Sequence, residues 1–491
     1  MRIQTENDTI AAIATALSPS GIGIVRISGP EAVNVASRVF CAGAAQRTDV
    51  SAYESHTVHY GRIADPENGR IIDEVMLLVM RAPRTYTRED TVEIDCHGGV
   101  LVTKRVLEAV LHAGARLAEP GEFTKRAYLN GRIDLSQAEA VAGIISAKND
   151  LALRNSVRQL GGRERAEITE IRGELLREIA QIEATLDDPE HLSFDGFDTT
   201  MRKNTESQSA RICRLLATAD DGRRIKEGIR TVIVGRPNAG KSSLLNALLQ
   251  EDRAIVTEIA GTTRDTLTEE VNLRGITLLL VDTAGIREST DVVEALGVAR
   301  AKEAAASADL ILYVADSSAP IDPADRLILA SCKGKPMIPL LNKSDLPPAV
   351  SAAEIGALVD ESMGEGQYAC ESKRGDVDGH REANTATDPI MISAKTGEGI
   401  EALEERITEM FFAERLRADE ECLITSERHK QELIAARDSL ARVQESIDAG
   451  MSEDFYTIDL TAAYEALGRI LGEEPDEDVI NAIFAEFCLG K

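Results

Sequence analysis

GRPNAGKS, residues 235–242, is the stretch that decides how the centre of this 491-residue chain folds. It fits the pattern G-x-x-x-x-G-K-[ST], follows the apolar run TVIVG and precedes the helical pattern KSSLLNALL. Glycines in such a loop let backbone N–H groups close on phosphates, and the N-terminus of the next helix adds positive potential. Lys241 would neutralise the β- and γ-phosphates, and Ser242 would bind Mg²⁺. The stretch therefore predicts a strand, a phosphate loop and a helix.

Two downstream motifs would surround the γ-phosphate. GTTRD (261–265) contains Thr263, which would cap Mg²⁺ and the γ-phosphate. DTAG (282–285) follows the apolar run ITLLLV, so Asp282 would lie beside Mg²⁺ and Gly285 beside the γ-phosphate.

Two further motifs would hold the base. NKSD (342–345) follows the run MIPLL, and SAK (393–395) follows IMI. Asp345 can accept hydrogen bonds from N1 and N2 of guanine, which adenine does not offer. Five motifs in this order, each after a strand-like run, predict a parallel-sheet domain that binds GTP, and together they resemble a translation-factor-class G domain. The candidate GTP-binding residues are Asn238, Ala239, Gly240, Lys241, Ser242, Ser243, Thr257, Thr263, Asp282, Thr283, Ala284, Gly285, Asn342, Lys343, Asp345, Ser393, Ala394 and Lys395.

The residue that orients the attacking water is not where Ras-like enzymes have it. Those enzymes place a glutamine directly after DTAG, whereas this chain has Ile286, which cannot orient water. Glu294, in DVVEALGVARA, is the strongest nearby candidate. Chemistry alone leaves open whether Glu294 orients the water or is a solvated acid at the start of a helix.

The charge is distributed unevenly along the chain. The formal net charge is −28; residues 1–150 contribute −3 (16 basic, 19 acidic) and residues 401–491 contribute −14 (9 basic, 23 acidic). A polyanion would be repelled by the C-terminal part. If the protein contacts nucleic acid, we therefore expect the contact in the N-terminal half.

Cysteine spacing and hydropathy indicate the compartment. The seven cysteines are scattered with no C-x-x-C pair, which argues against a disulfide framework and a structural zinc site. Apolar runs such as VMLLVM (75–80) are too short to span a membrane, and the polar start MRIQTENDTI is not a signal peptide. We expect a cytoplasmic protein with no membrane contact.

Changes in periodicity divide the chain into four segments. Residues 1–120 alternate strand-like runs with helical patterns and predict a mixed α/β domain. Residues 121–224 and 411–491 have helical periodicity and predict one discontinuous helical domain, with residues 225–410 inserted as the G domain. Within the first helical part, apolar residues from Leu160 to Leu186 predict one long amphipathic helix. Residues 364–389 are polar and Gly-rich and predict a long surface loop.

Further segments carry a resemblance to a known family. GIGIVRISG, EIDCHGG and PGEFTKRAYLNGRIDLSQAEA, with the nucleotide motifs and the ending FCLGK, resemble the MnmE (TrmE) family of bacterial tRNA-modification GTPases over essentially the whole chain. The resemblance implies an N-terminal folate-binding domain that dimerises, a discontinuous helical domain and an inserted G domain.

The resemblance also implies a reaction and its partners. The family forms a homodimer and a heterotetramer with MnmG (GidA), and FAD is bound by that partner only. Together they install an aminomethyl-type group, commonly carboxymethylaminomethyl, at C5 of the wobble uridine of certain tRNAs. A tetrahydrofolate derivative (5-formyl- or 5,10-methylene-) supplies the one-carbon unit. GTP hydrolysis is driven by K⁺-dependent dimerisation of the G domains.

The resemblance assigns roles to individual residues. It implies that Glu294 orients the attacking water and that Asn238 ligates K⁺. The remaining K⁺ ligands would be backbone oxygens of the loop 257–262, from Thr257, Ile259 and Thr262. The implied folate contacts are Arg26, Glu93, Arg132 and Lys491. Position 132 is lysine in some relatives, and arginine keeps the charge but changes the geometry.

Cys488, in the ending IFAEFCLGK, has four interpretations. A prenylation box is disfavoured by Gly490, Lys491 and the acidic segment before them. A metal ligand has no neighbouring ligand pattern, and a buried core thiol would suit the apolar face that Cys488 shares with Phe484. The family resemblance favours an active-site role, in which the tail enters the folate pocket.

Two other functions compete with tRNA modification. A regulatory GTPase switch in ribosome assembly would need neither the 220 residues before the G domain nor the Cys-x-Gly-Lys ending. A membrane-remodelling GTPase would need an amphipathic basic helix, which the sequence does not show. We expect a GTPase that participates in tRNA wobble-uridine modification.

Overall fold

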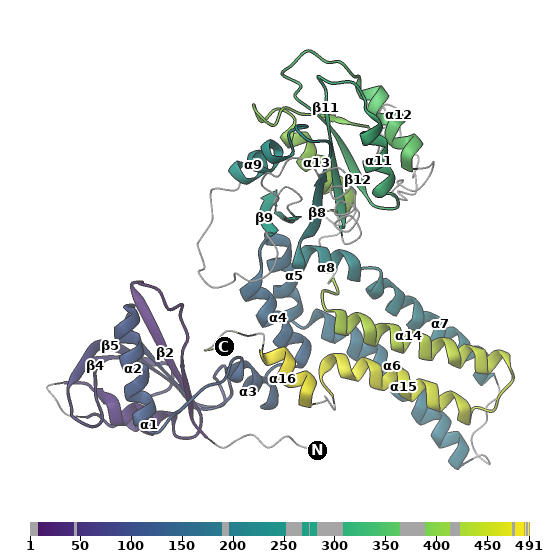
Figure 1. The fold of residues 1–491 in the computed structure, drawn as a ribbon. Helices are drawn as coiled ribbons and strands as arrows, with labels where there is room; N and C mark the ends of the chain where they lie inside the picture. The colour runs from purple at the N-terminus through teal and green to yellow at the C-terminus, as the bar shows by residue number, and fades with distance from the viewer. Residues whose placement is uncertain are drawn as a thin grey trace, which may run out of the picture. The chain divides into compact units, whose positions relative to one another are not determined.

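The computed structural model describes residues 8–43, 47–188, 196–251, 268–273, 275–281, 308–363, 388–412, 423–473, 477–485, 487 and 490. The chain forms two compact units. The first comprises residues 1–146, 156–213 and 431–491, and the second comprises residues 147–155 and 214–430. Each unit combines segments that are distant in sequence, as the colours of Figure 1 show.

The first unit begins with a seven-stranded sheet in the order β3-β4-β5-β6-β2-β1-β7. All neighbouring strands are antiparallel except β1 and β7, which are parallel. Two helices and a short 3₁₀ turn share one buried apolar cluster with the strands. The mixed α/β prediction is confirmed. The elements are β1 Ile10–Ile13, β2 Ile22–Ser28, α1 Ala32–Val39, β3 Phe40–Cys41, η1 Val50–Ala52, β4 Thr57–Ala64, β5 Ile71–Met80, β6 Thr91–His97, α2 Val100–His112 and β7 Arg116–Leu117.

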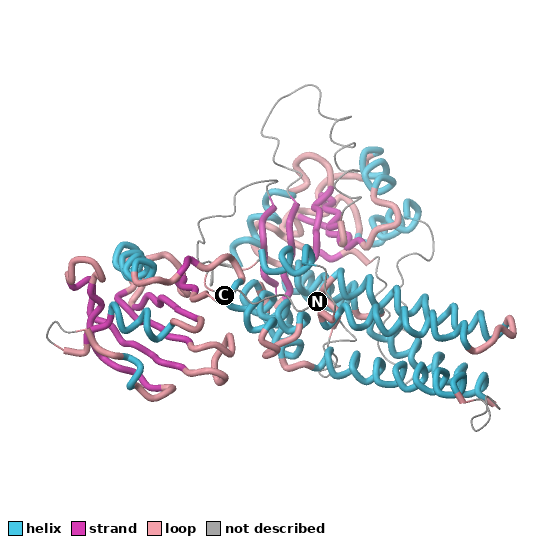
Figure 2. The backbone as a smooth tube through the Cα atoms, turned by 90° about the horizontal axis from the view of Figure 1, so that it is seen from below, coloured by secondary structure: helices cyan, strands magenta, loops and turns pink. Residues whose placement is uncertain are grey.

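The rest of the first unit is helical (Figure 2). Its longest helix, α6, packs on α15, where the Arg172 guanidinium carbon lies 4.1 Å from the centre of the Tyr464 ring. The division between the units falls inside α5, α7 and α14. The helices are α3 Glu122–Leu129, α4 Leu135–Ser146, α5 Asp150–Leu160, α6 Arg163–Asp187, α7 Phe197–Leu216, α14 Glu427–Asp448, α15 Asp454–Leu471 and α16 Glu477–Ala485.

The helix predicted from Leu160 to Leu186 is correct except at its start. Leu160 is the last residue of α5, and α6 begins at Arg163. Between them, Gly162 has φ +81°, a left-handed conformation that glycine adopts without a steric penalty and that ends the run of helical residues. The apolar stripe itself is confirmed, because Ile168, Ile171, Leu175 and Ile182 are fully buried.

The second unit contains a six-stranded sheet in the order β13-β12-β11-β8-β10-β9. Only the edge strand β9 is antiparallel to its neighbour. Residues of the adjacent strands β8, β11 and β12 enter two separate core clusters; in β11, Leu312 and Val314 enter one, and Ile311 and Tyr313 enter the other. Both faces of the sheet are therefore covered, which confirms the predicted parallel-sheet fold. The elements are α8 Ala219–Glu227, β8 Ile229–Val234, α9 Lys241–Glu251, β9 Thr268–Leu273, β10 Ile276–Val281, β11 Leu310–Asp316, α11 Pro323–Ser331, β12 Met337–Asn342, α12 Ala352–Met363, β13 Ile390–Met391 and α13 Ile400–Phe412.

Candidate functional site

The phosphate-loop stretch joins the end of β8 to the start of α9. Gly235 has φ +153° and Gly240 has φ +99°. A Cβ atom would lie 2.2 Å from Val314 O at Gly235 and 2.1 Å from Asn342 Nδ2 at Gly240. Side chains at these two positions would collide with neighbouring strands, so the loop requires glycine there.

Lys241 lies in the first turn of α9. Its Nζ donates hydrogen bonds to the carbonyls of Gly235 and Arg236, both at 2.8 Å. Burial lowers the pKa of the Lys241 ammonium group because desolvation disfavours its charge. The ammonium group is thus held inside the loop, where an anionic ligand would restore its preference for the charged state.

Asn342, the last residue of β12, connects the phosphate loop to the SAK segment. Its Nδ2 donates to Ala239 O at 2.9 Å, and its Oδ1 accepts from the Ala394 backbone N at 3.0 Å. The side chain is buried, with 2% exposure. One amide therefore fixes the positions of two loops that are separated by more than 150 residues in sequence.

Asp345 and Lys343 occupy the loop after β12. Ser393 Oγ donates to Asp345 Oδ1 at 2.8 Å, which orients a carboxylate that is otherwise exposed. Lys343 has φ +66°, and its Nζ lies 2.6 Å from Asp316 Oδ2. Burial opposes ionisation of Asp316, but hydrogen bonds from Lys343 and Ser318 outweigh it and lower the pKa of Asp316. The loop is therefore anchored at both ends, with the Asp345 carboxylate oriented by its neighbour.

The structure brings together one part of the predicted nucleotide site. Asn238, Gly240, Lys241, Asn342 and Ala394 lie at the carboxyl edge of the sheet, where ligands bind in open α/β folds. Asn238 has φ +62°, a left-handed conformation. Ala239, Lys343, Asp345, Ser393 and Lys395 belong to the same loops, and Ser242 and Ser243 lie in the first turn of α9. Thr257, Ile259, Thr262, Thr263, Asp282, Thr283, Ala284, Gly285 and Glu294 lie outside the described residues.

Arg26 and Glu93, two predicted folate contacts, are cross-strand partners in β2 and β6. Arg26 Nε donates to Glu93 Oε1 at 2.7 Å, and each side chain is 16% exposed. The Arg26 guanidinium also lies over the rings of Tyr86 and Phe123, at 5.8 and 5.7 Å from their centres. The pair is a partly buried cation and carboxylate framed by aromatic rings.

Arg132 approaches the same place from the turn between α3 and α4. Its guanidinium carbon lies 4.7 Å from the centre of the Tyr86 ring, and Nη1 donates to Tyr86 O at 3.1 Å. Arg26 Nη1 donates to Gly490 O at 3.4 Å. A Cβ atom at Gly490 would lie 2.3 Å from Ile13 O, so this position of the tail requires glycine. Arg26 and Arg132 thus both lie over Tyr86, and Glu93 is held beside them through its pair with Arg26. Lys491 and Cys488 lie outside the described residues.

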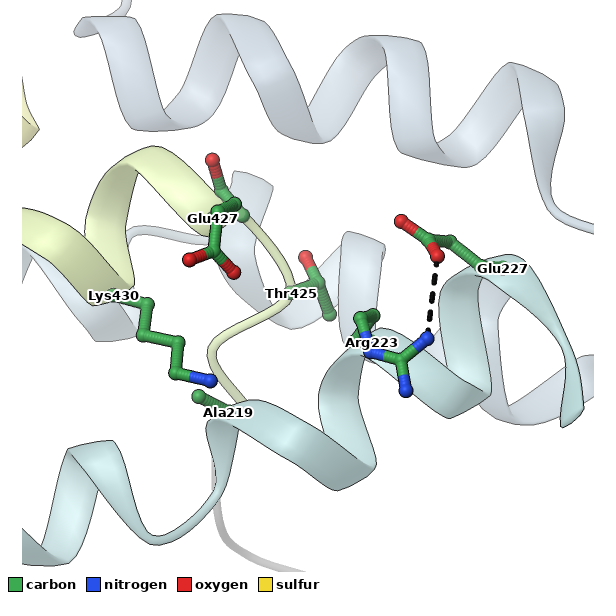
Figure 3. A pocket seen from close by; sticks show the side chains of 7 residues that line it. Ala219, Arg223, Glu227, Thr425, Glu427 and Lys430 are labelled. Carbon is green, nitrogen blue, oxygen red and sulfur yellow. Dashed lines mark ion pairs between the residues drawn. The ribbon is translucent and has the colours of Figure 1, made fainter. Parts of the chain in front are cut away.

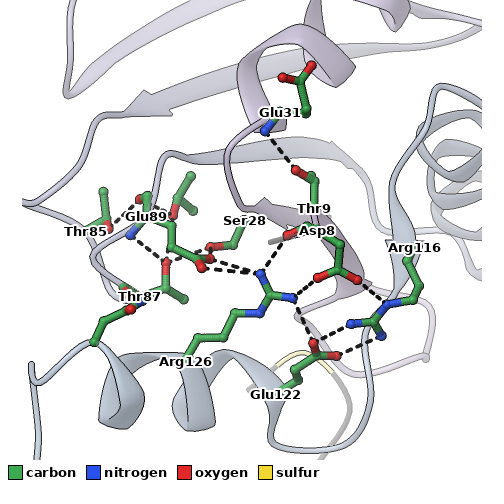
Figure 4. A network of polar contacts seen from close by, with 12 residues as sticks. Asp8, Thr9, Ser28, Glu31, Thr85, Thr87, Glu89, Arg116, Glu122 and Arg126 are labelled. Atoms are coloured by element: carbon green, nitrogen blue, oxygen red, sulfur yellow. Dashed lines mark hydrogen bonds and ion pairs between the residues drawn. The ribbon is translucent and has the colours of Figure 1, made fainter. Parts of the chain in front are cut away.

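A buried ionic network holds α3 against the sheet beside this site (Figure 4). Arg126, whose side chain is 5% exposed, pairs with Asp8, Glu89 and Glu122. Arg116 also pairs with Asp8 and Glu122, both at 2.6 Å. Burial would raise the pKa of Asp8 and of Glu122, but hydrogen bonds and charges from the two arginines outweigh it and lower both values. The network had no signal in the sequence, because its members come from four separate segments.

Arg126→Met should weaken the first unit in a pH-dependent way. Removing one partner of a buried ion pair costs up to about 3 kcal/mol of unfolding free energy. Here Glu89 loses its arginine partner, and Asp8 and Glu122 keep only Arg116. The pKa values of Asp8 and Glu122 are lowered in the folded protein. The stabilisation is therefore present above the values of 3.8 and 4.5 and is lost as pH falls through the lower folded values.

Urea unfolding of the full chain, followed by circular dichroism, measures this effect at pH 7 and below pH 4. The difference between wild type and Arg126→Met should be large at pH 7 and shrink in acid. Arg62→Met, which removes an exposed pair with Glu74 in the same sheet, is the control and should change little. A pH-independent difference would contradict the electrostatic explanation.

A cavity of about 270 Å³ lies between α8 and the start of α14 (Figure 3). Its lining includes none of the predicted site residues. Its cations are already paired: Arg223 with Asp309 and Glu227, and Lys430 with Asp220. We assign no ligand to it. The lining residues are Ala219, Arg223, Glu227, Thr425, Ser426, Glu427 and Lys430.

The described residues contain no group of three or more His, Cys, Asp or Glu side chains that could hold a metal ion. No helix within the described ranges has the length and hydropathy needed to span a membrane. The Mg²⁺ ligands predicted here are hydroxyl groups, of which Ser242 is described, at the start of α9, and Thr263 is not.

Comparisons with known proteins agree with this architecture. Residues 9–132 match a family model described as the GTP-binding protein TrmE N-terminus, and residues 135–488 match one described as the MnmE helical domain. The tRNA modification GTPase MnmE of Lachnoclostridium phytofermentans is 52% identical over 99% of this chain and 100% of its own length. Proteins of the same name from Lactiplantibacillus plantarum and Geobacillus kaustophilus are each 44% identical; they match over 100% and 99% of this chain and over their full lengths. The chain therefore belongs to the MnmE (TrmE) family of tRNA modification GTPases.

Proposed function

We propose that this chain hydrolyses GTP and, with an FAD-dependent partner of the MnmG (GidA) kind, modifies C5 of the wobble uridine in certain tRNAs. The observation that supports GTP most directly is the double hydrogen bond of Asn342. It joins the phosphate loop to the SAK segment, while Ser393 orients the Asp345 carboxylate. Full-length similarity to proteins named tRNA modification GTPase MnmE supports the modification.

In the proposed hydrolysis step, the residues of this chain position GTP and stabilise its developing charge. Lys241 would neutralise the β- and γ-phosphates, and Ser242 and Thr263 would hold Mg²⁺, with Asp282 beside it. Asn238, with Thr257, Ile259 and Thr262, would hold K⁺, which supplies positive charge where other GTPases use an arginine. Glu294 would orient the attacking water in place of the missing glutamine.

The K⁺ proposal predicts a specific salt effect. GTP hydrolysis by the purified chain should be faster in KCl than in NaCl at equal ionic strength. Bulk screening is the same in both salts, so only a site that discriminates between the ions can produce a difference. Asn238→Ala should reduce the ratio of the two rates toward one. Equal rates for the wild type would contradict the K⁺ role of Asn238.

The Arg26–Glu93 pair supports the folate proposal. A carboxylate suits the amino and ring N–H donors of a pterin, and arginines suit the glutamate carboxylates of a folate. Tyr86, between Arg26 and Arg132, offers an aromatic face. The bound tetrahydrofolate derivative would supply the one-carbon unit, and Lys491 and Cys488 would join the site from the tail.

An exposed face of the N-terminal sheet supports the homodimer proposal. Val58, Tyr60 and Met76 are 58%, 69% and 44% exposed, and Tyr60 lies opposite Met76 in the register of β4 and β5. Apolar patches of this kind on a sheet favour association with another surface. We propose a cytoplasmic homodimer that assembles with the FAD-dependent partner as a heterotetramer. We retain the proposed domains 1–120, 121–224, 225–410 and 411–491.

Reconstitution tests the proposed function. The purified chain, the FAD-dependent partner, unmodified tRNA, GTP, 5,10-methylenetetrahydrofolate and an amine donor (ammonium or glycine, which supplies the nitrogen) are combined in KCl, and the tRNA nucleosides are analysed by mass spectrometry. Formation of a C5-aminomethyl-type uridine should require GTP, the folate and both proteins. GTP hydrolysis with no modified nucleoside under any condition would contradict the proposal and favour a regulatory GTPase switch in ribosome assembly.

A further inference from the structure

Residues 147–155 belong to the unit that carries the nucleotide loops, although the chain on both sides of them belongs to the other unit. Ala152 is part of a core cluster of the six-stranded sheet, and Ala147 and Leu151 pack against that cluster. We call residues 147–155 the docking segment. The packing shows that this piece of the helical sequence is built into the core of the nucleotide-binding unit.

Hydrogen bonds tie the docking segment to both strands of the β9–β10 hairpin, which lies beside α5 in Figure 1. Asn149 Nδ2 donates to Thr277 Oγ1 on β10 at 3.1 Å. Asn272 Nδ2 on β9 donates to Lys148 O at 2.6 Å, and Lys148 forms an ion pair with Glu270 on the same strand. Thr277 and Asn272 are direct partners in the hairpin register. The docking segment is therefore bonded to both strands of this hairpin.

The hairpin lies between two candidate nucleotide-sensing segments. β9 begins at Thr268, shortly after Thr263, and β10 ends at Val281, directly before Asp282. Rearrangement of these flanking segments on γ-phosphate loss is a common way for GTPases to switch state. A hairpin joined to both segments is well placed to respond to that rearrangement.

Asn149 also fixes the start of α5. Its Oδ1 accepts from the Ala152 backbone N at 2.8 Å, so the side chain caps the helix that begins at Asp150. The same side chain donates to Ile225 O in α8 at 3.0 Å. Asn149 is 9% exposed. One buried amide therefore joins the hairpin, α8 and the first turn of α5.

The far end of α5 reaches the cluster beside the candidate folate site. Leu160, its last residue, packs against a buried apolar cluster that includes Ile480, Phe484 and Phe487, and Tyr86 packs against the same cluster. In the same region, Gln137 Nε2 donates to Leu160 O at 2.8 Å. Arg26 and Arg132 both face the Tyr86 ring. Ile480 and Phe484 lie in α16 and Phe487 follows it; we call residues 477–491 the C-terminal tail. A shift of α5 would therefore disturb the packing of Leu160 against residues of the C-terminal tail.

We propose that Asn149 is a positioning residue that transmits the nucleotide state of the β9–β10 hairpin to α5, and through α5 to the tail. This inference rests on the proposed function, because the reaction that the coupling would control is tRNA modification. It needs no contact between Asn149 and GTP or tRNA. On the hairpin, the Thr277 hydroxyl accepts the hydrogen bond from Asn149, so Thr277 is the partner residue in this connection.

Hydrogen–deuterium exchange of the full chain tests the transmission directly. The exchange rates of the backbone amides of residues 150–160 are measured in KCl in two states, one with GDP alone and one with GDP plus aluminium fluoride. The wild type should show a difference between the two states, and Asn149→Ala should lose it. Thr277→Val, which keeps the cap of α5 but removes the hydroxyl on the hairpin, should lose the difference as well.

Asn155→Ala is the matched control. Asn155 is also buried in the docking segment and makes two hydrogen bonds to the Leu423 backbone, at 2.9 and 3.1 Å, but makes none to the described residues of the hairpin. It should keep the exchange difference. Asn149→Ala should hydrolyse GTP near the wild-type rate while tRNA modification falls by about tenfold or more, the size of a typical coupling between sites.

Three results of the exchange experiment would overturn the proposal: no exchange difference in the wild type, a difference that survives Asn149→Ala, or a loss that Asn155→Ala reproduces. A modification rate that falls only in proportion to hydrolysis would do the same. If the exchange results agree with the proposal but the wild type modifies no tRNA, the proposed function is contradicted. The coupling between the β9–β10 hairpin and α5 is then still supported. The two failures are therefore distinguishable.

Discussion

Asp345→Asn should lower the affinity for GTP by about 10³-fold and create affinity for XTP. In the proposed site the carboxylate would accept hydrogen bonds from N1 and N2 of guanine, and each hydrogen bond to a charged group contributes about 1.5–3 kcal/mol. An asparagine amide can accept one hydrogen bond and donate another, which suits the carbonyl that xanthine carries at C2. Ser393 Oγ donates to Asp345 Oδ1 at 2.8 Å, so the side chain is already oriented for this recognition.

Equilibrium binding of GTP and XTP to the wild type and to Asp345→Asn measures the switch. Asp360→Asn, an exposed aspartate on α12, is the control and should bind GTP normally. Gain of XTP binding separates loss of recognition from loss of folding, because an unfolded variant would bind neither nucleotide. Unchanged GTP affinity would contradict the assignment of NKSD to the base.

Lys241→Ala should lower the rate of GTP hydrolysis by about 10²–10³-fold at saturating nucleotide, the usual effect of losing one preorganised group that stabilises transition-state charge. Lys241 Nζ donates hydrogen bonds to the Gly235 and Arg236 carbonyls beside the start of α9. Its pKa is lowered by burial, so the site holds a poorly solvated cation that favours an anionic partner.

Single-turnover hydrolysis separates this effect from weak binding. Lys333→Ala, an exposed lysine of the same unit, is the control and should retain the wild-type rate. Because Lys241 acts on charge that grows during the reaction, the hydrolysis rate should fall more than the affinity for GDP. Hydrolysis by Lys241→Ala within a fewfold of the wild type would show that GRPNAGKS is not the phosphate loop of the reaction.

The nucleotide loops could be predicted from sequence because each is local. A glycine-rich stretch between a strand-like run and a helical run specifies its own turn, and β8, β12 and β13 end where the motifs begin. The covered parallel sheet was predictable for the same reason, since runs such as LILYVAD are apolar at almost every position.

Contacts between distant segments could not be predicted in this way. Asn342 was expected to bind nucleotide, but its bonds to Ala239 and Ala394 depend on how three loops meet. The docking segment looked like ordinary helical sequence, since Ala147, Leu151 and Ala152 fit helical spacing whichever core they join. The break before α6 did have a signal, the pair Gly161–Gly162, which the apolar periodicity outweighed.

Mass spectrometry of wobble nucleosides in tRNA from cells lacking this chain tests the central claim most directly. We predict that C5-aminomethyl-type uridines disappear, that the wild-type chain restores them, and that Cys488→Ser does not, although that variant still hydrolyses GTP. Restoration by Cys488→Ser would return Cys488 to the role of a buried core thiol. An unchanged nucleoside profile in the cells that lack the chain would contradict the account and leave a GTPase that acts as a regulatory switch.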